Sequence, residues 1–279
     1  MTPSASTGLV VLLGDPVSHS LSPALHNAAF AADGLDLVYL ACGVAPEALP
    51  EAVAGLDALG ALGANVTLPH KEAAARLADE RAPEAEATGA ANTLVRAERG
   101  WRAHNTDIAG FLGPLAEHDL AGADVTVLGA GGAARAVVYA LLSAVRPSRL
   151  TLAARRTGQA EALAADLAAH DARGALAVRP LAEAPAARLV VNCTPLGVSG
   201  MEDLTPFSGS LGRGQIAYDL VYRPAQTRFL REAQAHGAEA IGGLPMLIGQ
   251  AAEAYRLWTG RPMPTEPARR AALAALSRD

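Results

Sequence analysis

The sequence predicts an α/β protein with two domains, the second of which contains a doubly wound parallel sheet. Short apolar segments alternate with helical ones along most of the chain, which is typical of a sheet covered by helices. The length of 279 residues is near the upper limit for one hydrophobic core, so two domains are expected. The stretch DVTVLGAGGAARAVVYALL indicates a strand, a glycine turn and a helix in direct succession.

The first part of the chain is predicted to begin with a strand at residues 9–13, LVVLL, which ends at the turn residues GDP. A helix follows, with Ser22 as its N-cap and Pro23 at its first position. The remaining predicted elements of this part are a strand at 38–42, a helix at 47–59, a strand at 64–67 that is stopped by Pro69, and a helix at 71–77.

The character of the sequence changes near residues 111–123, and a unit suited to binding a dinucleotide follows. Glycines 129 and 131 permit a tight turn and a close backbone approach to a pyrophosphate, and Ala134 is the small residue where the helix packs on the strand. The free N–H groups at the helix start would face the phosphates. A glycine-rich turn alone is a weak signal, but the adjoining strand and helix and a second strand at 150–154 predict dinucleotide binding.

The end of that second strand reads AARRT and indicates which dinucleotide binds. NAD-binding units usually carry an acidic residue there, which bonds the ribose 2′-hydroxyl, and this sequence has none at that place. Arg155 and Arg156 could instead hold the 2′-phosphate of NADP through bidentate, charge-assisted hydrogen bonds. The alternative is an exposed basic turn that binds nothing.

Two segments near the C-terminus, MLIGQAAEAYRLWTG and PARRAALAALS, have helical periodicity. These helices, at residues 244–279, follow two predicted domains: residues 1–108, and residues 109–243, which contain the dinucleotide-binding unit. A crevice between the domains is the expected ligand site.

Lys71, at the end of the stretch NVTLPHK, is the one lysine among the 23 Lys and Arg residues of the chain. An arginine stays protonated at any accessible pH, whereas a lysine can release and take up a proton. Lys71 is therefore a candidate catalytic acid or base, with chance retention as the alternative.

Asparagine is also scarce, and its positions are informative. The five are Asn27, Asn65, Asn92, Asn105 and Asn192. The amide donates and accepts together, which suits sugar-like hydroxyls, although a single asparagine more often serves a turn or cap. Four polar patches precede the dinucleotide unit: GDPVSHSLSPALHN (14–27), NVTLPHK (65–71), GAANT (89–93) and HNTD (104–107). If strand ends bring them to one crevice, they predict a reducible, polyhydroxylated substrate.

Composition disfavours several other classes of protein. The net charge is −5 and the basic residues are scattered, which argues against a nucleic-acid partner. Two cysteines cannot form a disulfide framework, and neither cysteines nor histidines have metal-ligand spacing, so no metal is expected. The N-terminus lacks a basic signal region, and no apolar stretch approaches the roughly 20 residues of a membrane span, so a cytoplasmic protein without a membrane partner is predicted.

The motifs, taken in order, resemble those of the shikimate dehydrogenase family. They are GxPxxHSxSPxxHN, NVTxPxK, GAxNT, NTD, GAGGAxR, the basic turn, NxTPLG, DLVYxPxxT and GxxMLxxQ, and they span nearly the whole chain. The resemblance implies an NADP-dependent oxidoreductase that acts on a CH–OH group, reducing 3-dehydroshikimate to shikimate in aromatic amino acid biosynthesis. It also implies an N-terminal α/β substrate-binding and catalytic domain at residues 1–108 and a Rossmann-type NADP-binding domain at residues 109–243. The C-terminal helices at residues 244–279 would return to the first domain, so that Gln250 can reach the substrate.

On the substrate side, the resemblance implies that Lys71 and Asp107 form the catalytic pair. The substrate-binding residues that it implies are Ser20 and Ser22 for the carboxylate, Thr67 and Asn92 for ring hydroxyls, and Lys71, Asp107, Tyr222 and Gln250. Asn65 and Asn105 are expected to order the loops that present them. Lys71 would donate a proton in the reductive direction, and it would titrate with Asp107 as a unit if the two are close.

On the cofactor side, the resemblance implies a larger set of residues. They are Gly129, Ala130, Gly131, Gly132 and Ala133 under the pyrophosphate, Arg155, Arg156 and Thr157 around the 2′-phosphate, Thr194 along the ribose, and Leu220, Gly243 and Met246 near the nicotinamide. The family's basic turn usually reads Asn-Arg-Thr, and Arg155 stands here in place of the asparagine. The contact expected of Arg156 is therefore the firmer one.

Three alternatives to this function stay open. They are a quinate/shikimate dehydrogenase that uses NAD, a dehydrogenase for an altered ring, and a non-catalytic NADP-dependent sensor. The Arg pair disfavours the first, and the presence of both Lys71 and Asp107 disfavours the last, because binding alone needs no proton donor. The sequence does not determine the oligomeric state, and a homodimer is one option.

Overall fold

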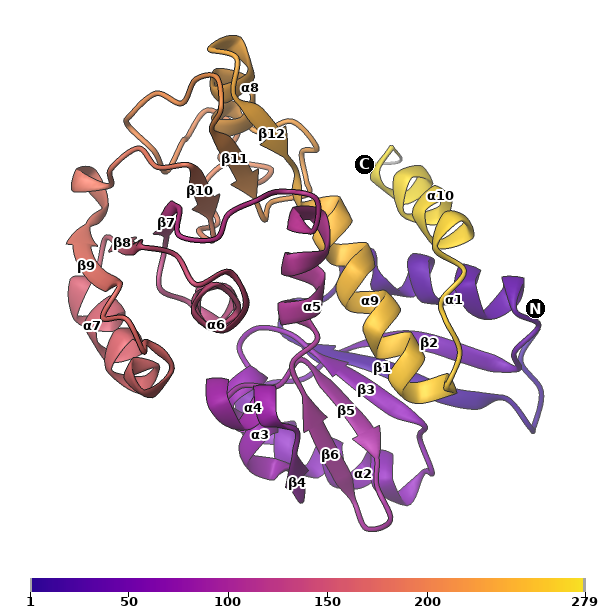
Figure 1. Ribbon diagram of the computed structural model, residues 1–279. Helices are drawn as coiled ribbons and strands as arrows, with labels where there is room; N and C mark the ends of the chain where they lie inside the picture. The colour runs from indigo at the N-terminus through magenta and orange to yellow at the C-terminus, as the bar shows by residue number, and fades with distance from the viewer. Residues whose placement is uncertain (1, 278–279) are drawn as a thin grey trace. The chain divides into compact units, whose positions relative to one another are not determined.

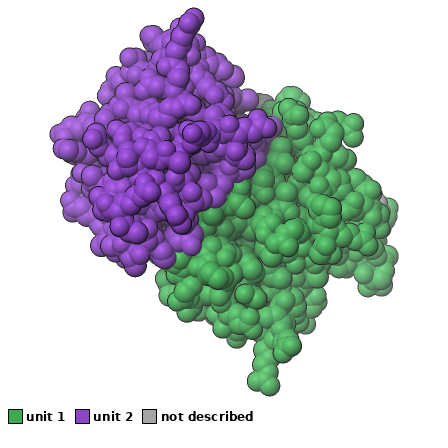
Figure 2. Space-filling model, viewed as in Figure 1, with its two compact units in different colours: residues 1–110, 248–279 green, residues 111–247 purple. Residues whose placement is uncertain are grey.

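The computed structural model describes residues 2–277, which form an α/β protein of two compact units (Figures 1 and 2). Unit 1 comprises residues 1–110 and 248–279, and unit 2 comprises residues 111–247. Each unit is built on a six-stranded sheet. The predicted α/β class is therefore confirmed, and the chain divides within a few residues of the predicted boundaries.

The sheet of unit 1 is mixed and has the strand order β2-β1-β3-β5-β6-β4. Its strands are β1 (Gly8–Gly14), β2 (Leu37–Gly43), β3 (Gly63–Val66), β4 (Glu80–Arg81), β5 (Thr93–Arg96) and β6 (Trp101–His104). Strands β2, β1 and β3 are parallel, whereas β5 runs antiparallel to both β3 and β6. As a result, the ends of β1, β3 and β6 and the start of β5 lie at one edge of the sheet.

The helices of the N-terminal part follow the predicted order. They are α1 (Ser22–Ala32), α2 (Leu49–Ala58) after a 3₁₀ turn at Pro46–Ala48, α3 (Lys71–Leu77), α4 (Pro83–Thr88) and α5 (Asp107–Leu112). Helices α2 and α3 contribute Leu49, Val53 and Ala74 to an apolar core that they share with Val11 and Leu94 of the sheet. Burying these side chains stabilises the fold by roughly 25 cal/mol per Å² of apolar surface.

The predicted N-cap of α1 is wrong by one residue. Ser22 is the first residue of α1, and Leu21, which has no side-chain acceptor, occupies the cap position. The hydroxyl of Ser20 accepts the N–H of Ser22 at 3.2 Å instead. Pro23 remains in the first turn, where its missing N–H would have had no helical partner in any case.

Unit 2 contains a fully parallel sheet with the strand order β12-β11-β10-β7-β8-β9. Its strands are β7 (Asp124–Leu128), β8 (Arg149–Ala154), β9 (Leu176–Pro180), β10 (Leu189–Asn192), β11 (Ile216–Asp219) and β12 (Glu239–Ile241), and its helices include α6 (Gly132–Ala140), α7 (Thr157–Asp166) and α8 (Arg228–Ala235). This is the doubly wound order, in which the direction of winding reverses between β7 and β10. Ligands of such sheets bind beyond the strand ends at that reversal.

The C-terminal helices α9 (Gly243–Thr259) and α10 (Thr265–Leu276) complete unit 1 from residue 248 onward, and α10 packs on α1 (Figure 1). The Tyr255 hydroxyl donates to Asp33 at 2.5 Å, and the Trp258 indole N–H donates to the carbonyl of Leu94 at 3.0 Å. A side chain at Gly63 would lie 2.1 Å from that indole nitrogen, so glycine makes room for it. Unit 1 is thus assembled from two stretches far apart in the sequence.

In the part of the chain that the structure describes, no helix is both long enough and apolar enough to cross a membrane.

Candidate active site

Lys71 and Asp107 form an ion pair in unit 1, with Lys71 Nζ 2.5 Å from Asp107 Oδ2. Lys71 is the first residue of α3, just after the loop that follows β3, and Asp107 is the first residue of α5, shortly after β6. The two side chains are 16% and 10% exposed, so the pair is largely shielded from water while the ammonium stays reachable. The two residues of the predicted catalytic pair are therefore brought together.

Asn92 holds the other carboxylate oxygen of Asp107. Its Oδ1 accepts the N–H of Thr106 at 2.8 Å, and a backbone amide can only donate, so the opposite end of the side chain must be Nδ2. Nδ2 donates to Asp107 Oδ1 at 2.8 Å and to Gln250 Oε1 at 3.5 Å. Because both oxygens of Asp107 are held, its carboxylate is fixed in orientation toward Lys71.

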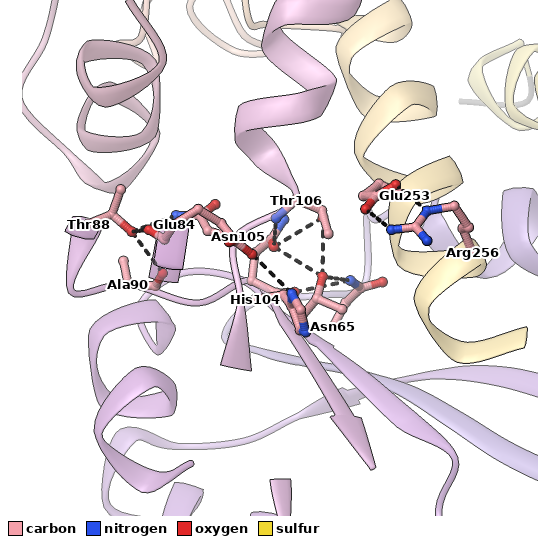
Figure 3. A network of polar contacts seen from close by, with 11 residues as sticks. Asn65, Glu84, Thr88, Ala90, His104, Asn105, Thr106, Glu253 and Arg256 are labelled. Carbon is pink, nitrogen blue, oxygen red and sulfur yellow. Dashed lines mark hydrogen bonds and ion pairs between the residues drawn. The ribbon is translucent and has the colours of Figure 1, made fainter. Parts of the chain in front are cut away.

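A second layer of buried polar side chains supports Asn92. Asn65 and Thr106 of this layer are labelled in Figure 3. Asn65 Nδ2 donates to the Asn92 carbonyl and to Thr93 Oγ1, each at 3.0 Å, and the Tyr39 hydroxyl donates to Asn65 Oδ1 at 2.8 Å. The sequence predicts a role for Asn65, but not for Tyr39, Thr93 or Thr106. The two threonines stand in the GAANT and HNTD patches, which was an available signal, whereas Tyr39 lies in an apolar strand that carries none.

Ser20, Ser22 and Thr67 lie at the same edge of the unit 1 sheet. Ser20 and Ser22 follow β1, and Thr67 follows its parallel neighbour β3. Gly14, the last residue of β1, allows Thr67 to approach, because a Cβ built there would lie 2.3 Å from the Thr67 methyl group. Ser22 is 7% exposed and Ser20 is half-buried. Apart from Gln250, which lies on α9, the predicted substrate residues of unit 1 therefore stand in, or directly after, the loops that follow β1, β3 and β6 and the loop that precedes β5.

Two histidines near these loops, His70 and His104, have structural partners. His70 Nε2 donates to the carbonyl of Val44 at 2.7 Å, and His104 Nδ1 lies 3.0 Å from a carboxylate oxygen of Glu84. Burial raises the pKa of Glu84, but the hydrogen bonds from His104 and the backbone lower it by a larger amount. The pKa of Glu84 is therefore below its ordinary value. Burial lowers the pKa of His26 to about 3, which keeps this histidine neutral. Among residues 2–277, no group of three His, Cys, Asp or Glu side chains could hold a metal ion.

In unit 2, Gly129, Ala130 and Gly131 connect β7 to α6 at the reversal of the strand order. Gly129 has a φ of 103°, and a Cβ there would lie 3.0 Å from the Thr194 methyl group. A Cβ at Gly131 would have no described atom within 4 Å, so open space lies in front of this backbone. Gly131 is the N-cap of α6 and has no side chain to occupy the first N–H groups, which leaves them for an anionic ligand.

The residues at the end of β8 fit a phosphate group. Arg155 and Arg156 are exposed, Arg156 is the N-cap of α7 and Thr157 is its first residue. The segment from Ala153 to Thr157 contains no acidic side chain that would repel a 2′-phosphate. Together with the open glycine turn, these residues fit the pyrophosphate and 2′-phosphate of NADP.

The remaining predicted residues lie at the ends of β11 and β12. Leu220 follows β11, and Gly243 begins α9, where a Cβ would lie 2.3 Å from the Leu220 carbonyl oxygen. Met246 is buried one turn further along α9. Tyr222 also belongs to unit 2, whereas the other predicted substrate residues belong to unit 1. Burial raises the pKa of Tyr222, so its phenol stays protonated.

A doubly wound sheet with an open glycine turn and an Arg pair, and a lysine–aspartate pair suited to proton transfer, define the class of NADP-dependent oxidoreductases. Two family models match the chain: the shikimate dehydrogenase substrate binding domain at residues 12–94 and the shikimate 5′-dehydrogenase C-terminal domain at residues 243–273. A shikimate dehydrogenase (NADP(+)) of Salinibacter ruber is 57% identical over 93% of this chain and 95% of its own length. This chain belongs to the shikimate dehydrogenase family.

Solved structures agree with this assignment. Shikimate 5-dehydrogenase from Thermus thermophilus, in complex with NADP(H) and shikimate, is 40% identical with a TM-score of 0.84, over 96% of this chain and 99% of that one. Quinate dehydrogenase from Corynebacterium glutamicum, in complex with NAD, is 31% identical with a TM-score of 0.85, over 96% and 99% of the two chains. The predicted family and fold class are confirmed.

Proposed function

We propose that this protein catalyses the reversible, NADPH-dependent reduction of 3-dehydroshikimate to shikimate in the shikimate pathway of aromatic amino acid biosynthesis. The observation that carries the proposal is the Lys71–Asp107 pair, held at 2.5 Å and oriented by Asn92, in a chain 57% identical to a shikimate dehydrogenase (NADP(+)). A protein that only bound its ligands would have no use for a proton donor that is largely shielded from water and held by a fixed counter-ion.

The chemistry needs one hydride and one proton. Bound NADPH supplies the hydride to the carbonyl carbon of the substrate. Lys71 donates a proton from Nζ to the oxygen on which negative charge develops, and in the reverse direction its neutral amine takes that proton back. Asp107 holds Lys71 Nζ at 2.5 Å, which fixes the position of the proton donor.

The substrate would be held by hydroxyl and amide groups along the edge of the unit 1 sheet. Ser20 and Ser22 bind the carboxylate in this proposal, and Thr67 and Asn92 bind ring hydroxyls, with Gln250 beside Asn92. Asn92 Oδ1 already accepts a hydrogen bond from Thr106, and one Nδ2 hydrogen is donated to Asp107. The second Nδ2 hydrogen is therefore available to Gln250 or to the substrate. Tyr222 is proposed as a further substrate contact.

The cofactor would lie on unit 2. Gly129 to Ala133 take the pyrophosphate in this proposal, supported by the open space at Gly131, and Arg155, Arg156 and Thr157 take the 2′-phosphate. Thr194 follows the ribose, and Leu220, Gly243 and Met246 approach the nicotinamide. A cytoplasmic location and a homodimer stay predictions.

The test is absorbance at the nicotinamide band with purified protein, shikimate or quinate, and NADP or NAD. Fast reduction of NADP by shikimate, and slow reaction of the other three pairs, is the expected result. Faster reaction with NAD or quinate would favour the second candidate, a quinate/shikimate dehydrogenase, whose support is the 31% identity to the Corynebacterium glutamicum quinate dehydrogenase. Tight binding of NADP without turnover of any pair would instead favour a sensor or a dehydrogenase for an altered ring.

Arg156→Ala is expected to raise KM for NADP by about tenfold or more while KM for NAD stays the same. The reason is that a charge-assisted hydrogen bond to a phosphate contributes about 1.5–3 kcal/mol, and NAD has no 2′-phosphate. The matched control is Arg149→Ala, because Arg149 is an exposed arginine at the opposite end of β8. Equal changes in KM for both cofactors would contradict the assignment of Arg156.

A further inference from the structure

A buried chain of hydrogen bonds in unit 2 runs from Thr194 to the start of α8. Thr194 donates from its N–H at 2.9 Å and from Oγ1 at 2.7 Å to Asn192 Oδ1. Asn192 Nδ2 donates to Asp219 Oδ1 at 2.9 Å. Thr227, the N-cap of α8, donates from Oγ1 to Asp219 Oδ2 at 2.6 Å. Asn192, Asp219 and Thr227 are each 0% exposed.

Asp219 is the centre of this chain. Besides Asn192 and Thr227, the N–H of Val221 donates to its Oδ1 at 3.0 Å, so three donors converge on one carboxylate. Burial raises the pKa of Asp219 to about 6, and these hydrogen bonds oppose the rise. Near neutral pH the group is therefore an anion, which is the form that three donors require. Neither proton transfer nor substrate binding in the proposed mechanism uses it.

This chain of hydrogen bonds ends at residues 193–196, the loop that lies next to the glycine turn. Asn192 is the last residue of β10, and its partner in the neighbouring strand β7 is Leu128, which directly precedes Gly129. A Cβ at Gly129 would lie 3.0 Å from the Thr194 methyl group and 3.2 Å from the backbone carbonyl of Cys193. The loop therefore lies so close to the turn that a side chain at Gly129 would not fit between them, and a shift of the loop would change the space beside the turn.

The orientation of Asn192 shows that Asp219 fixes this loop from behind. The N–H of Thr194 can only donate, so Asn192 Oδ1 faces the loop and Nδ2 faces Asp219. Nδ2 also donates to the carbonyl of Leu196 at 3.2 Å, so one amide holds the loop at two places. Without Asp219, the Asn192 side chain would lose its main anchor and could turn away from the loop.

We propose that Asp219 is a positioning residue for the dinucleotide: through Asn192 it holds residues 193–196 against the glycine turn and thereby sets the affinity for NADP. This inference rests on the proposed binding of NADP at the turn. The inference can be distinguished from a purely structural role. If Asp219 were only structural, replacing it would lower stability alone, whereas replacing a positioning residue changes the affinity for NADP in protein that remains folded.

The experiment compares Asp219→Asn and Asp219→Ala with the unchanged protein, by titrating NADP calorimetrically without substrate and by measuring KM for NADP, KM for shikimate and kcat. The nearly isosteric Asp219→Asn guards against misfolding of the alanine variant. The control is Thr126→Val, which removes a buried hydrogen bond of 2.9 Å to the Pro185 carbonyl from the same sheet, away from the turn. Thermal unfolding of each variant reports stability separately.

The dissociation constant for NADP should rise about tenfold in Asp219→Ala and less in Asp219→Asn, with KM for shikimate within about twofold of the unchanged protein. Asn192→Ala should raise the dissociation constant by a similar factor. The double variant Asp219→Ala/Asn192→Ala should bind NADP no more weakly than either single variant, because both residues act through the same chain of hydrogen bonds. Thr126→Val should lose stability and bind NADP normally.

Two results would overturn the inference. Unaltered NADP affinity in folded Asp219→Asn and Asn192→Ala would show that the chain is structural only. If Thr126→Val lost as much NADP affinity as the Asp219 variants, the affinity would depend on the stability of unit 2 in general. If the unchanged protein fails to bind NADP, both the proposed function and this inference fall, whereas normal NADP binding with unaffected variants overturns the inference alone.

Discussion

Lys71→Arg is expected to lower kcat by about 10²- to 10⁴-fold, the usual contribution of a positioned acid or base. The guanidinium keeps the positive charge beside Asp107 but cannot release a proton at accessible pH. Binding of NADP, measured by calorimetry, should not change, because Lys71 belongs to unit 1 and the glycine turn to unit 2. The measurement is steady-state turnover of shikimate with NADP.

The control for this variant is Arg76→Lys, which exchanges the same two residue types at an exposed position of the same helix. It should leave kcat unchanged. Near-normal turnover in Lys71→Arg would show that the reaction takes its proton from another group, and Asp107 or a water molecule would then have to be considered.

Asn92→Asp is expected to lower kcat/KM by about 100-fold or more at pH 8, and by less at pH 6. The change replaces the Nδ2 that donates to Asp107 at 2.8 Å by an oxygen, so two carboxylates would face each other in a buried place. Their repulsion raises the pKa of the introduced carboxyl. As pH falls through that raised pKa, the new O–H can donate to Asp107, and activity relative to the unchanged protein should recover.

Asn92→Ala separates the two causes of this loss. It removes the donor without adding a charge, so its activity relative to the unchanged protein should not recover at low pH. If the pH profiles of Asn92→Asp and Asn92→Ala were parallel, the orientation of Asp107 by Asn92 would not matter to the reaction, and only the substrate contact of Asn92 would remain.

Local sequence patterns were sufficient for the fold where the physical signal is local. Apolar runs bounded by glycine and proline predicted β1, β2 and β7, and the strand-turn-helix pattern predicted the start of the doubly wound sheet. The cap of α1 was misplaced because Ser20 and Ser22 are both good capping residues two positions apart, and sequence alone does not tell which hydroxyl folds back. A 3₁₀ turn before α2 and the short β4 have no comparable signal.

The candidate site was predictable to the extent that it depends on rare residue types. Lys71 was found because lysine occurs once, and Asn65 and Asn92 because asparagine occurs five times. No role was predicted for Tyr39 or for Asp219, although Asp219 begins the motif DLVYxPxxT. Each acts through a distant partner: Tyr39 is 26 residues from Asn65, and Asp219 is 27 residues from Asn192. Such pairs follow from strand order, which one sequence without its fold does not provide.

The C-terminal helices that complete unit 1 have a consequence for how the protein is made. Residues 111–247 form unit 2 as one continuous stretch, so this sheet can fold while synthesis continues. Unit 1 is in a different position: its first 110 residues must wait for Tyr255 to reach Asp33 and for Trp258 to reach the strand at Leu94. The stretch at residues 1–110 is therefore completed only after α9 and α10 have been synthesised, and until then Asp33 and the carbonyl of Leu94 lack the partners that they have in the folded unit.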